Sequence, residues 1–296
     1  MHMHWYHALI LGIVEGITEF LPVSSTGHLI IASAMMGLDD DPNRKAAVDA
    51  YSIVIQAFAL LAIVGLYFPR CWQMLKGLFG FDPAGQRLLV HLLLAFIPIL
   101  ILGPLLHERI MEHLFRPVPV LLALALGGIW MIWLGRRGPS AAKSDEPTSA
   151  PSGGELHDMT WKQAVGIGLF QCVSLWPGTS RAMMTIAGGT MLGLKPTRSA
   201  EFSFLLGLPT IGGAMVYQLA KDFFVEKDVE TLHMIDVLGW TPILVGCVST
   251  VVFAALAVKW LVAFLERHGL AIFGWYRIAL CLAMISMLGT GFITLN

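Results

Sequence analysis

The sequence predicts an all-α polytopic membrane protein built from two inverted repeats, each a re-entrant helical hairpin followed by three transmembrane helices. Three observations predict this fold. Of the 296 residues, 56% are hydrophobic and only 13% are charged, and the mean hydropathy of +0.72 lies outside the range of soluble domains. Six stretches are apolar over roughly 20 residues, which is long enough to cross a bilayer. Two further apolar segments are broken midway by short polar sequences that contain proline.

The first repeat covers residues 1–137 and begins with the broken segment 6–37. The sequence LPVSSTG interrupts this segment, where Pro22 ends one half-helix and small polar residues start another. Irregular backbone is tolerated at membrane depth only where it is buried in protein or faces a wet cavity, so we expect this turn inside the molecule. The three spans of this repeat are predicted at residues 46–68, 86–106 and 117–135.

The second repeat covers residues 161–296 and follows a linker, 138–160, that is rich in Ser, Pro, Gly and Ala. The linker is expected to be flexible and to lie in the cytoplasm. The repeat begins with a second broken segment, 161–193, which WPGTS interrupts. Its three spans are predicted at residues 199–219, 240–264 and 270–294.

The two broken segments are similar to each other. FLPVSS at 20–25 aligns with LWPGTS at 175–180, which pairs Pro22 with Pro177 and Ser25 with Ser180. Each broken segment precedes three spans, so each repeat crosses the bilayer an odd number of times and the second is inverted relative to the first. The loops at one predicted face carry most of the Lys and Arg residues, which places that face in the cytoplasm and both termini outside.

Composition excludes several classes of function. The formal net charge is -1, and the sequence has neither a basic tail nor an acidic block, so no nucleic-acid binding is predicted. The cysteines are far apart, with no CxxC pair and no histidine at zinc spacing. Free thiols in apolar surroundings, rather than disulfides or zinc ligands, are therefore expected at Cys71, Cys172, Cys247 and Cys281.

Two carboxylates lie in the first broken segment. Glu15 and Glu19 are four residues apart, so on a helix they lie on one face, one above the other. Two adjacent carboxylates in apolar surroundings repel each other unless a cation, a basic group or a proton lies between them. The alternative is a shallow hairpin whose glutamates only reach the lipid headgroups, but ionisable residues inside a membrane are functional by default.

Both turns have the features of an anion site. Ser24 or Ser25 can cap the half-helix that starts after Pro22, which leaves free N–H groups and the positive end of the helix dipole directed at whatever lies beyond. In the second turn Thr179 and Ser180 open another half-helix. Arg181 adds a permanent charge that can bind phosphate through two hydrogen bonds.

Further polar side chains accompany the two turns. His28 lies three residues after Ser25, so its imidazole can approach a hydroxyl on the same half-helix and serve either as a general base or as the acceptor of a phosphoryl group. Glu201 is expected to position Arg181 or a helix end, unless it is a plain interfacial glutamate. Gln171 and Thr185 are expected to supply supporting hydrogen bonds.

These residues carry a resemblance to a known family. EGITEFLPVSSTGH, PGTSR and AEFSFLLGLP, in this order along nearly the whole chain, closely resemble the bacterial undecaprenyl-diphosphate phosphatases of the bacitracin-resistance type. The resemblance implies removal of the terminal phosphate from undecaprenyl diphosphate, which regenerates the lipid carrier for peptidoglycan and other envelope polymers. It also implies dependence on a divalent cation, a location in the bacterial inner membrane, and an active site open to the periplasm or the exterior.

The functional residues of the family map onto both turns. In this sequence they are Glu15, Glu19, Ser24, Ser25 and His28 in the first motif and Ser180, Arg181 and Thr185 in the second. The chain departs from the pattern at Ala182, where many members are expected to have serine, which puts a phosphate contact from that position in doubt. The acid-phosphatase-like lipid phosphatases have similar motifs, but their order differs, and Ala187 stands where they need histidine.

The resemblance and the residue pattern together suggest a mechanism. Glu15 and Glu19 are expected to hold Mg²⁺ or Ca²⁺, and Ser24, Thr26, Thr179, Ser180, Arg181 and Thr185 to bind the phosphates. Ser25 is the preferred nucleophile, with His28, assisted by Glu19, as its base; alternatively His28 accepts the phosphoryl group or activates water directly. A lipid-phosphate flippase would need the same anion site and is the rival function. The sequence leaves open whether the protein forms a homodimer.

Overall fold

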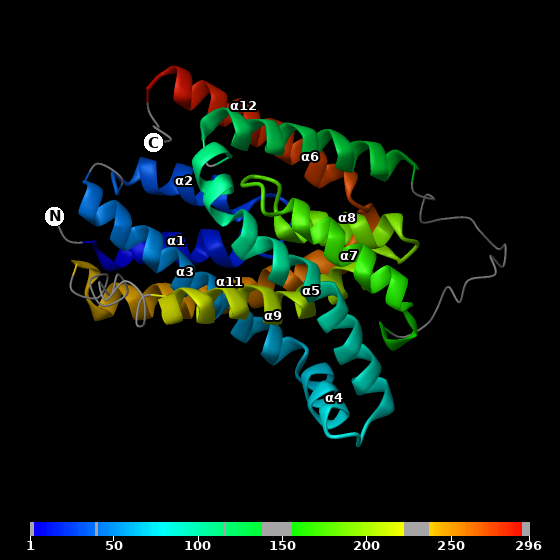
Figure 1. Ribbon diagram of the computed structural model, residues 1–296. Coiled ribbons are helices and arrows are strands. Elements are labelled where there is room, and N and C mark those ends of the chain that lie inside the picture. Colours follow the sequence, from blue (N-terminus) through cyan, green and yellow to red (C-terminus); the bar gives the residue numbers. More distant parts are fainter. Residues whose placement is uncertain (1–2, 39–40, 115, 138–155, 222–236, 292–296) are drawn as a thin grey trace.

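A computed structural model of the chain describes residues 3–38, 41–114, 116–137, 156–221 and 237–291. Every regular element within these ranges is a helix, and no strand occurs in them, which confirms the predicted all-α class (Figure 1). Six helices are long and apolar enough to span a membrane. They are α3 (Pro42–Leu66), α5 (Pro83–His113), α6 (Pro117–Arg137), α9 (Pro196–Lys221), α11 (Trp240–His268) and α12 (Ala271–Gly289).

Each of these helices contains the greater part of one predicted span, with shifted ends. Most helices are longer than the predicted span because polar first and last turns extend a helix without adding apolar length. The largest difference is at the end of α5, which continues to His113 where the predicted span ends at 106. The helix α12 ends at Gly289, and residues 292–294 of the predicted span 270–294 fall outside the described part of the chain. Most of the predicted linker 138–160 also falls outside it. The last residues of this linker include the short 3-10 helix η1 (Leu156–Asp158).

The two broken segments are helical hairpins, as predicted. In the first, α1 (Trp5–Thr18) is followed by a turn and by α2 (Ser25–Met35); in the second, α7 (Trp161–Val173) is followed by a turn and by α8 (Arg181–Met191). Figure 1 shows the hairpins entering the helix bundle from opposite ends, so that their turns meet near its centre. This arrangement fits the expected inversion, while the repeat relationship itself stays a prediction.

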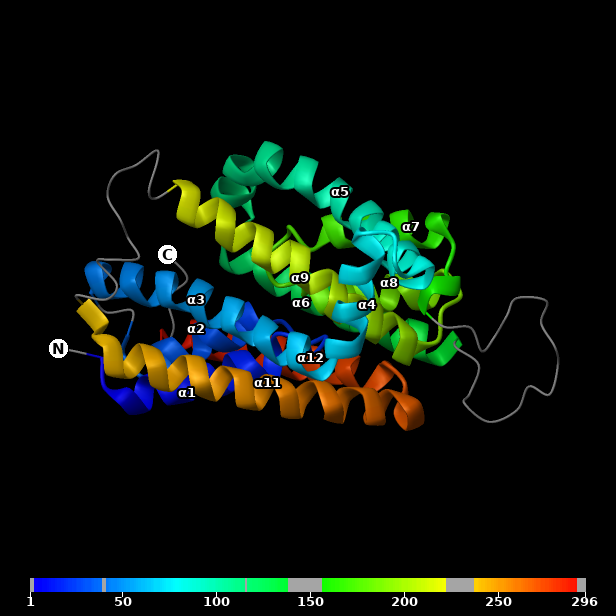
Figure 2. The same cartoon turned by 90° about the horizontal axis from the view of Figure 1, so that it is seen from below.

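One helix was not predicted. α4 (Phe68–Leu78) follows α3 almost directly and projects from the bundle together with the start of α5 (Figure 1). In the view from below, α4 lies in front of part of the bundle (Figure 2). Its buried side, at Met74 and Gly77, packs on α5, while Phe68, Trp72 and Leu75 are exposed. A short amphipathic helix with an uncovered apolar face is typical of a segment that lies in the membrane interface. α4 is too short and too polar to be recognised in the sequence as a membrane span.

Small residues bring the long helices into close contact. α1 packs along α11, where a Cβ atom on Gly16 would lie 2.7 Å from the Thr250 carbonyl oxygen. α6 packs along α12, where a Cβ on Gly128 would lie 2.9 Å from the Gly274 carbonyl oxygen. Because lipid offers no hydrophobic driving force between helices, such close backbone approach is the usual source of helix packing in membranes. These contacts fix α1 and α12, the two helices that carry much of the candidate site.

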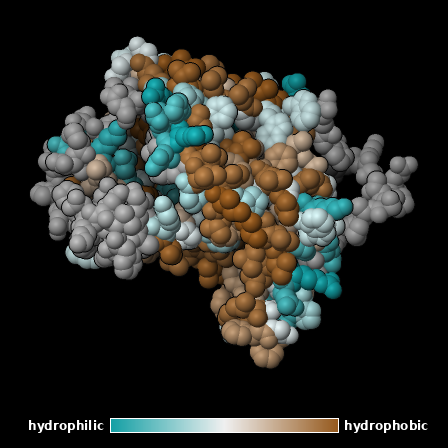
Figure 3. Space-filling view, viewed as in Figure 1, coloured by the Kyte–Doolittle hydropathy of each residue, from teal (hydrophilic) through white to brown (hydrophobic). Residues whose placement is uncertain are grey.

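The surface fits a bilayer environment. Hydrophobic side chains cover most of the middle of the face in Figure 3, and hydrophilic side chains gather toward its two ends. Exposed apolar residues include Leu100, Ile101 and Leu105 of α5 and Leu126 and Ile129 of α6. The four cysteines are free, as predicted. The molecule is therefore a multi-pass membrane protein.

Candidate active site

Both hairpin turns end in the same unusual backbone conformation. Ser24, with φ of 77°, precedes the first residue of α2, and Ser180, with φ of 71°, precedes the first residue of α8. No other non-glycine residue in the described ranges has a positive φ. Such a conformation is costly for a serine and tends to occur at functional sites. The structural equivalent of Ser180 is thus Ser24, so the predicted pairing of Ser25 with Ser180 is wrong by one position, because the second turn is one residue longer.

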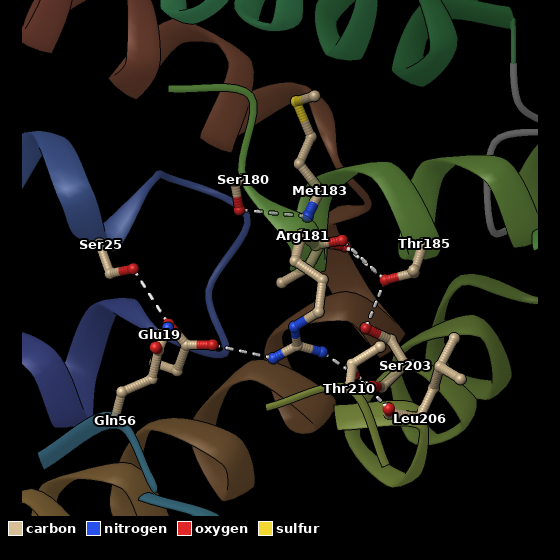
Figure 4. A network of polar contacts seen from close by, with 11 residues as sticks. Glu19, Ser25, Gln56, Ser180, Arg181, Met183, Thr185, Ser203, Leu206 and Thr210 are labelled. Carbon is tan, nitrogen blue, oxygen red and sulfur yellow. Dashed lines mark hydrogen bonds and ion pairs between the residues drawn. The ribbon is translucent and has the colours of Figure 1, made fainter. Parts of the chain in front are cut away.

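Glu19 joins the two turns. Its Oε1 atom accepts a hydrogen bond from Arg181 Nη2 at 3.1 Å, an ion pair between the first turn and the start of α8. Its Oε2 atom accepts from the Ser25 hydroxyl at 3.0 Å and from Gln56 Nε2 of α3 at 3.2 Å. In Figure 4 these side chains point toward one another. The structure therefore brings together residues from opposite halves of the chain around one carboxylate.

The guanidinium of Arg181 is held from several sides. Nη1 donates to the Ser203 carbonyl of α9 at 2.9 Å, and the group lies 5.7 Å from the centre of the Phe20 ring, a cation–π contact. Gly207 leaves room for it, since a Cβ there would lie 3.3 Å from Nη1. Nε is buried without a hydrogen-bond partner among the described residues. Arg181 is thus fixed in place and still has a donor to offer to an anion.

Hydroxyl groups complete the second turn. The Ser180 hydroxyl accepts from the Met183 amide and so caps α8 as predicted, and Thr179 donates to the Trp176 carbonyl at 2.7 Å. The Thr185 hydroxyl lies 2.6 Å from that of Ser203 and 2.9 Å from the Arg181 carbonyl oxygen, to which it donates. Thr185 is fully buried, and its hydroxyl therefore supports the backbone of Arg181. Thr26 lies half-buried in the first turn of α2.

Glu15 lies one helical turn before Glu19 and is 1% exposed. Glu15 therefore lies close enough to Glu19 and to Arg181 to feel the charge of both side chains. Glu15 Oε2 is buried without a partner in the described ranges. An unsatisfied carboxylate oxygen beside a second carboxylate is the donor chemistry that Mg²⁺ and Ca²⁺ prefer.

No group of three or more His, Cys, Asp or Glu side chains in the described ranges is placed to enclose a metal. Mg²⁺ needs no such cage, since it is commonly bound by one or two carboxylates together with waters and the phosphates of a substrate. Glu15 and Glu19 therefore fit a divalent cation that arrives with a phosphorylated ligand.

His28 is placed differently from the prediction. Its Nδ1 atom lies 2.7 Å from the Ser24 carbonyl oxygen, and its Nε2 atom lies 2.7 Å from the hydroxyl of Tyr276 on α12. The hydroxyl of Ser25 instead donates to Glu19. The expected approach of the imidazole to a serine hydroxyl is therefore wrong for this structure. The helical turn places the ring so that it reaches back to the backbone of residue 24 and outward to α12.

Two supporting residues also lie elsewhere. Glu201 forms ion pairs with Arg70 Nε at 3.6 Å and Arg198 Nη1 at 3.4 Å, so it joins α9 to α4 and does not position Arg181. Gln171 is fully buried on α7, and neither of its amide atoms has a hydrogen-bond partner in the described ranges. Its expected supporting hydrogen bond is not formed.

Four site residues escaped the sequence prediction: Gln56, Ser203, Tyr276 and Arg277. Arg277 is fully buried, and its Nη2 atom donates to the Gly178 carbonyl of the second turn at 2.8 Å and to the Ala123 carbonyl of α6 at 3.0 Å. Arg277 and Gln56 could have been identified from the sequence, because each is a polar side chain inside a predicted apolar span, and such side chains mark functional positions. Ser203 and Tyr276 gave no comparable signal.

The chain is similar to known proteins over nearly its whole length. The chain matches the family described as bacitracin resistance protein BacA over residues 8–283. It is 42% identical to an undecaprenyl-diphosphatase of Sorangium cellulosum, over 94% of this chain and 84% of that protein. It is 39% identical both to undecaprenyl-diphosphatase 1 of Chromobacterium violaceum, over 97% and 98% of the two chains, and to an undecaprenyl-diphosphatase of Pseudomonas aeruginosa, over 96% and 95%.

Proposed function

This chain belongs to the bacitracin resistance protein BacA family, and we propose that it hydrolyses undecaprenyl diphosphate to undecaprenyl phosphate and inorganic phosphate. The activity named for the relatives supports this function, since their similarity extends over nearly the whole chain. The enzyme would recycle the lipid carrier that peptidoglycan and other envelope polymers need. It would also lessen the effect of bacitracin, in agreement with the description of the family.

One observation carries the proposal at the level of residues. Arg181 and Ser25 come from different halves of the chain and both contact Glu19, at 3.1 and 3.0 Å. This arrangement sets a permanent positive charge, a hydroxyl nucleophile and a carboxylate base side by side. Positioning and charge neutralisation supply most of the catalysis in phosphoryl transfer, so this set supports the proposed chemistry.

We propose that Glu19 is the base for Ser25. The Ser25 hydroxyl gives its proton to Glu19 Oε2 while its oxygen attacks the terminal phosphorus of the lipid diphosphate. The bridging P–O bond breaks, and undecaprenyl phosphate leaves with the electron pair of that bond. Arg181 and the free amides at the start of α2 and α8 balance the charge on the phosphoryl oxygens. This step leaves a phosphoserine at position 25.

A water molecule then attacks the phosphoserine. It gives up one proton to a base and displaces the Ser25 oxygen, which regains a proton and releases inorganic phosphate. His28 is the base that we assign to this water, because it lies three residues after Ser25 on α2 and Glu19 already serves the Ser25 hydroxyl. Direct attack of water on the lipid diphosphate, or attack by His28 itself, remain the alternative routes.

Ser24, Thr26, Thr179, Ser180 and Thr185 line the two turns as proposed phosphate ligands or supports. Glu15 and Glu19 would hold a divalent cation, Mg²⁺ or Ca²⁺, which would neutralise phosphate charge when bound. The buried, unpartnered oxygen of Glu15 supports this assignment. We further propose a location in the bacterial inner membrane, with the site open to the periplasm or the exterior. The oligomeric state, including a homodimer, is left to experiment.

Phosphate release from the purified protein tests the function. Detergent micelles do not separate two compartments, so lipid transport cannot be observed in them. A phosphatase still releases inorganic phosphate from undecaprenyl diphosphate under these conditions, whereas a flippase that uses the same site does not. A chelator should suppress the release, and added Mg²⁺ or Ca²⁺ should restore it. Binding of the lipid without release of phosphate would favour the flippase, a function that the names of the relatives do not favour.

A further inference from the structure

The contact between α12 and the first hairpin has no role in the mechanism described above. Tyr276 of α12 and His28 of α2 lie 248 residues apart in sequence, yet their rings stack at 5.6 Å with an interplanar angle of 5°. The Tyr276 hydroxyl lies 2.7 Å from His28 Nε2. A stacked ring pair that also shares a short hydrogen bond restricts the imidazole to one orientation.

The second hydrogen bond of His28 determines its tautomer. Nδ1 lies 2.7 Å from the Ser24 carbonyl oxygen. A carbonyl oxygen can only accept a hydrogen bond, so Nδ1 must carry a proton. In the neutral ring Nε2 then has the lone pair, and the Tyr276 hydroxyl donates to it. Nε2 is therefore the nitrogen that can take a proton, and Tyr276 is its partner.

The two sides of the ring differ in exposure. Ser24 is 2% exposed, whereas Tyr276 is 47% exposed. Nδ1 thus faces the protein interior, and the Tyr276 hydroxyl occupies the lone pair of Nε2 on the more exposed side. Both ring nitrogens therefore have a partner, and the imidazole is held in one orientation.

The neighbouring residue fixes the place of Tyr276. Arg277 is fully buried and donates both to Gly178 of the second turn and to Ala123 of α6. These bonds hold this turn of α12 against the second hairpin. A Cβ on Gly127 would lie 2.6 Å from Arg277 Nη2, so α6 also leaves no space for the arginine to move. These contacts therefore fix the position of Tyr276 on α12.

We propose that Tyr276 is a positioning residue: its hydroxyl donates to Nε2 and, together with the Ser24 carbonyl at Nδ1, holds the His28 ring in the one orientation from which Nε2 can serve as the base. This inference deepens the proposed phosphatase function, on which its kinetic consequence rests. Tyr276 touches neither of the reacting groups proposed above, Ser25 and Glu19, in the described contacts, so its effect is expected through His28 alone.

The test compares Tyr276→Phe with the wild type and with Tyr217→Phe, which removes the hydroxyl of a 54% exposed tyrosine on α9. Tyr276→Phe keeps the ring stack and loses one hydrogen bond, so we expect kcat for phosphate release to fall about fivefold to tenfold with KM within about twofold. Tyr217→Phe should match the wild type. An unchanged kcat in Tyr276→Phe, or a change confined to KM, would overturn the proposal.

A second readout does not depend on activity. Nitrogen NMR of protein labelled with ¹⁵N-histidine, with His28 assigned from the spectrum of His28→Gln, should show Nδ1 protonated in the wild type. In Tyr276→Phe the Nε2 signal of His28 should move, because the hydrogen bond from the Tyr276 hydroxyl is lost, while Nδ1 stays protonated. An identical Nε2 signal in both proteins would contradict the positioning role. If the wild type releases no phosphate but the Nε2 signal moves as expected, the proposed function fails and the positioning of His28 stands.

Discussion

Both oxygens of the Glu19 carboxylate are already occupied. Arg181, Ser25 and Gln56 donate to them, so three parts of the chain are held at one point. The same donors would bind a phosphate, because a phosphate also offers acceptor oxygens and negative charge. A diphosphate that enters the site must therefore compete with Glu19 for Arg181. The resting ion pair keeps the guanidinium in place until the substrate arrives.

Arg181→Ala tests the role of this charge. We expect kcat/KM for phosphate release to fall by about 10² to 10³-fold, since one fixed donor to the transition state is lost. Arg267→Ala, in the exposed last turn of α11, is the matched control and should retain normal turnover. Both variants should keep the thermal unfolding temperature in detergent within a few degrees. Near-normal turnover of Arg181→Ala would show that the phosphate lies elsewhere.

Ser25 is testable as the nucleophile by trapping its phosphoryl adduct. We expect the terminal phosphate of a labelled prenyl diphosphate to appear on the peptide that contains Ser25 when turnover is stopped within milliseconds. Neutral detergent is the appropriate quench, because acid destroys phosphohistidine and base destroys phosphoserine. Mass spectrometry then assigns the site, and Ser25→Ala is the control that should carry no label. A label on His28 would refute Ser25 as nucleophile.

At the scale of elements, the structure places the site on half-helices that long helices hold in position. α1 carries Glu15 and ends directly before Glu19, and its position depends on Gly16, which meets the backbone of α11. A Cβ at this position would lie 2.7 Å from the Thr250 carbonyl oxygen, closer than van der Waals contact permits. α1 therefore cannot keep its present position if residue 16 is larger than glycine.

Gly16→Ala should lower both stability and activity. Overpacking against backbone costs about 1–3 kcal/mol, and any shift of α1 moves Glu19 away from Arg181. Gly65→Ala in α3 is the matched control, because no atom lies within 4 Å of a Cβ there and alanine favours helix. Thermal unfolding in detergent and phosphate release measure the two effects. Equal behaviour of the two variants would contradict the close packing of α1 on α11.

The sequence predicted those helices and hairpins that are determined by a short continuous stretch of residues. Six spans and two broken hairpins follow from apolar length and from Pro22 and Pro177, all readable within about 20 residues. α4 was missed because a short amphipathic helix leaves no such signal. The polar contacts depend on partners far apart in sequence: Glu19 and Arg181 are 162 residues apart, and His28 and Tyr276 are 248 apart. Spacing alone suggested that His28 would reach Ser25, and only the packing of α12 shows its actual partner.

At the scale of the whole molecule, the start of α1 and the end of α12 both lie toward the left of Figure 1. The segment that joins α4 to α5 lies at the bottom of Figure 1, right of its centre. We propose that the end of the bundle near this segment lies in the cytoplasm, because the loops there carry the excess of Lys and Arg. The two hairpins reach the same central site from opposite ends of the bundle.

Single cysteines in a background without the four native thiols test this orientation. His4→Cys, at the exposed start of the described chain, should react with a membrane-impermeant maleimide added to intact cells. Phe81→Cys, at a residue that is 80% exposed between α4 and α5, should react only after the membrane is permeabilised. The reverse pattern would place the first hairpin on the cytoplasmic side.

The account depends above all on the contact between the two halves of the chain at Glu19 and Arg181. A double-mutant cycle with Glu19→Asp and Arg181→Lys measures this contact through kcat/KM for phosphate release, because both substitutions keep the charge and leave measurable activity. We predict that the double variant loses at least tenfold less activity than the product of the two single losses, a coupling of about 1.4 kcal/mol or more. Losses that multiply within about twofold would contradict a shared site.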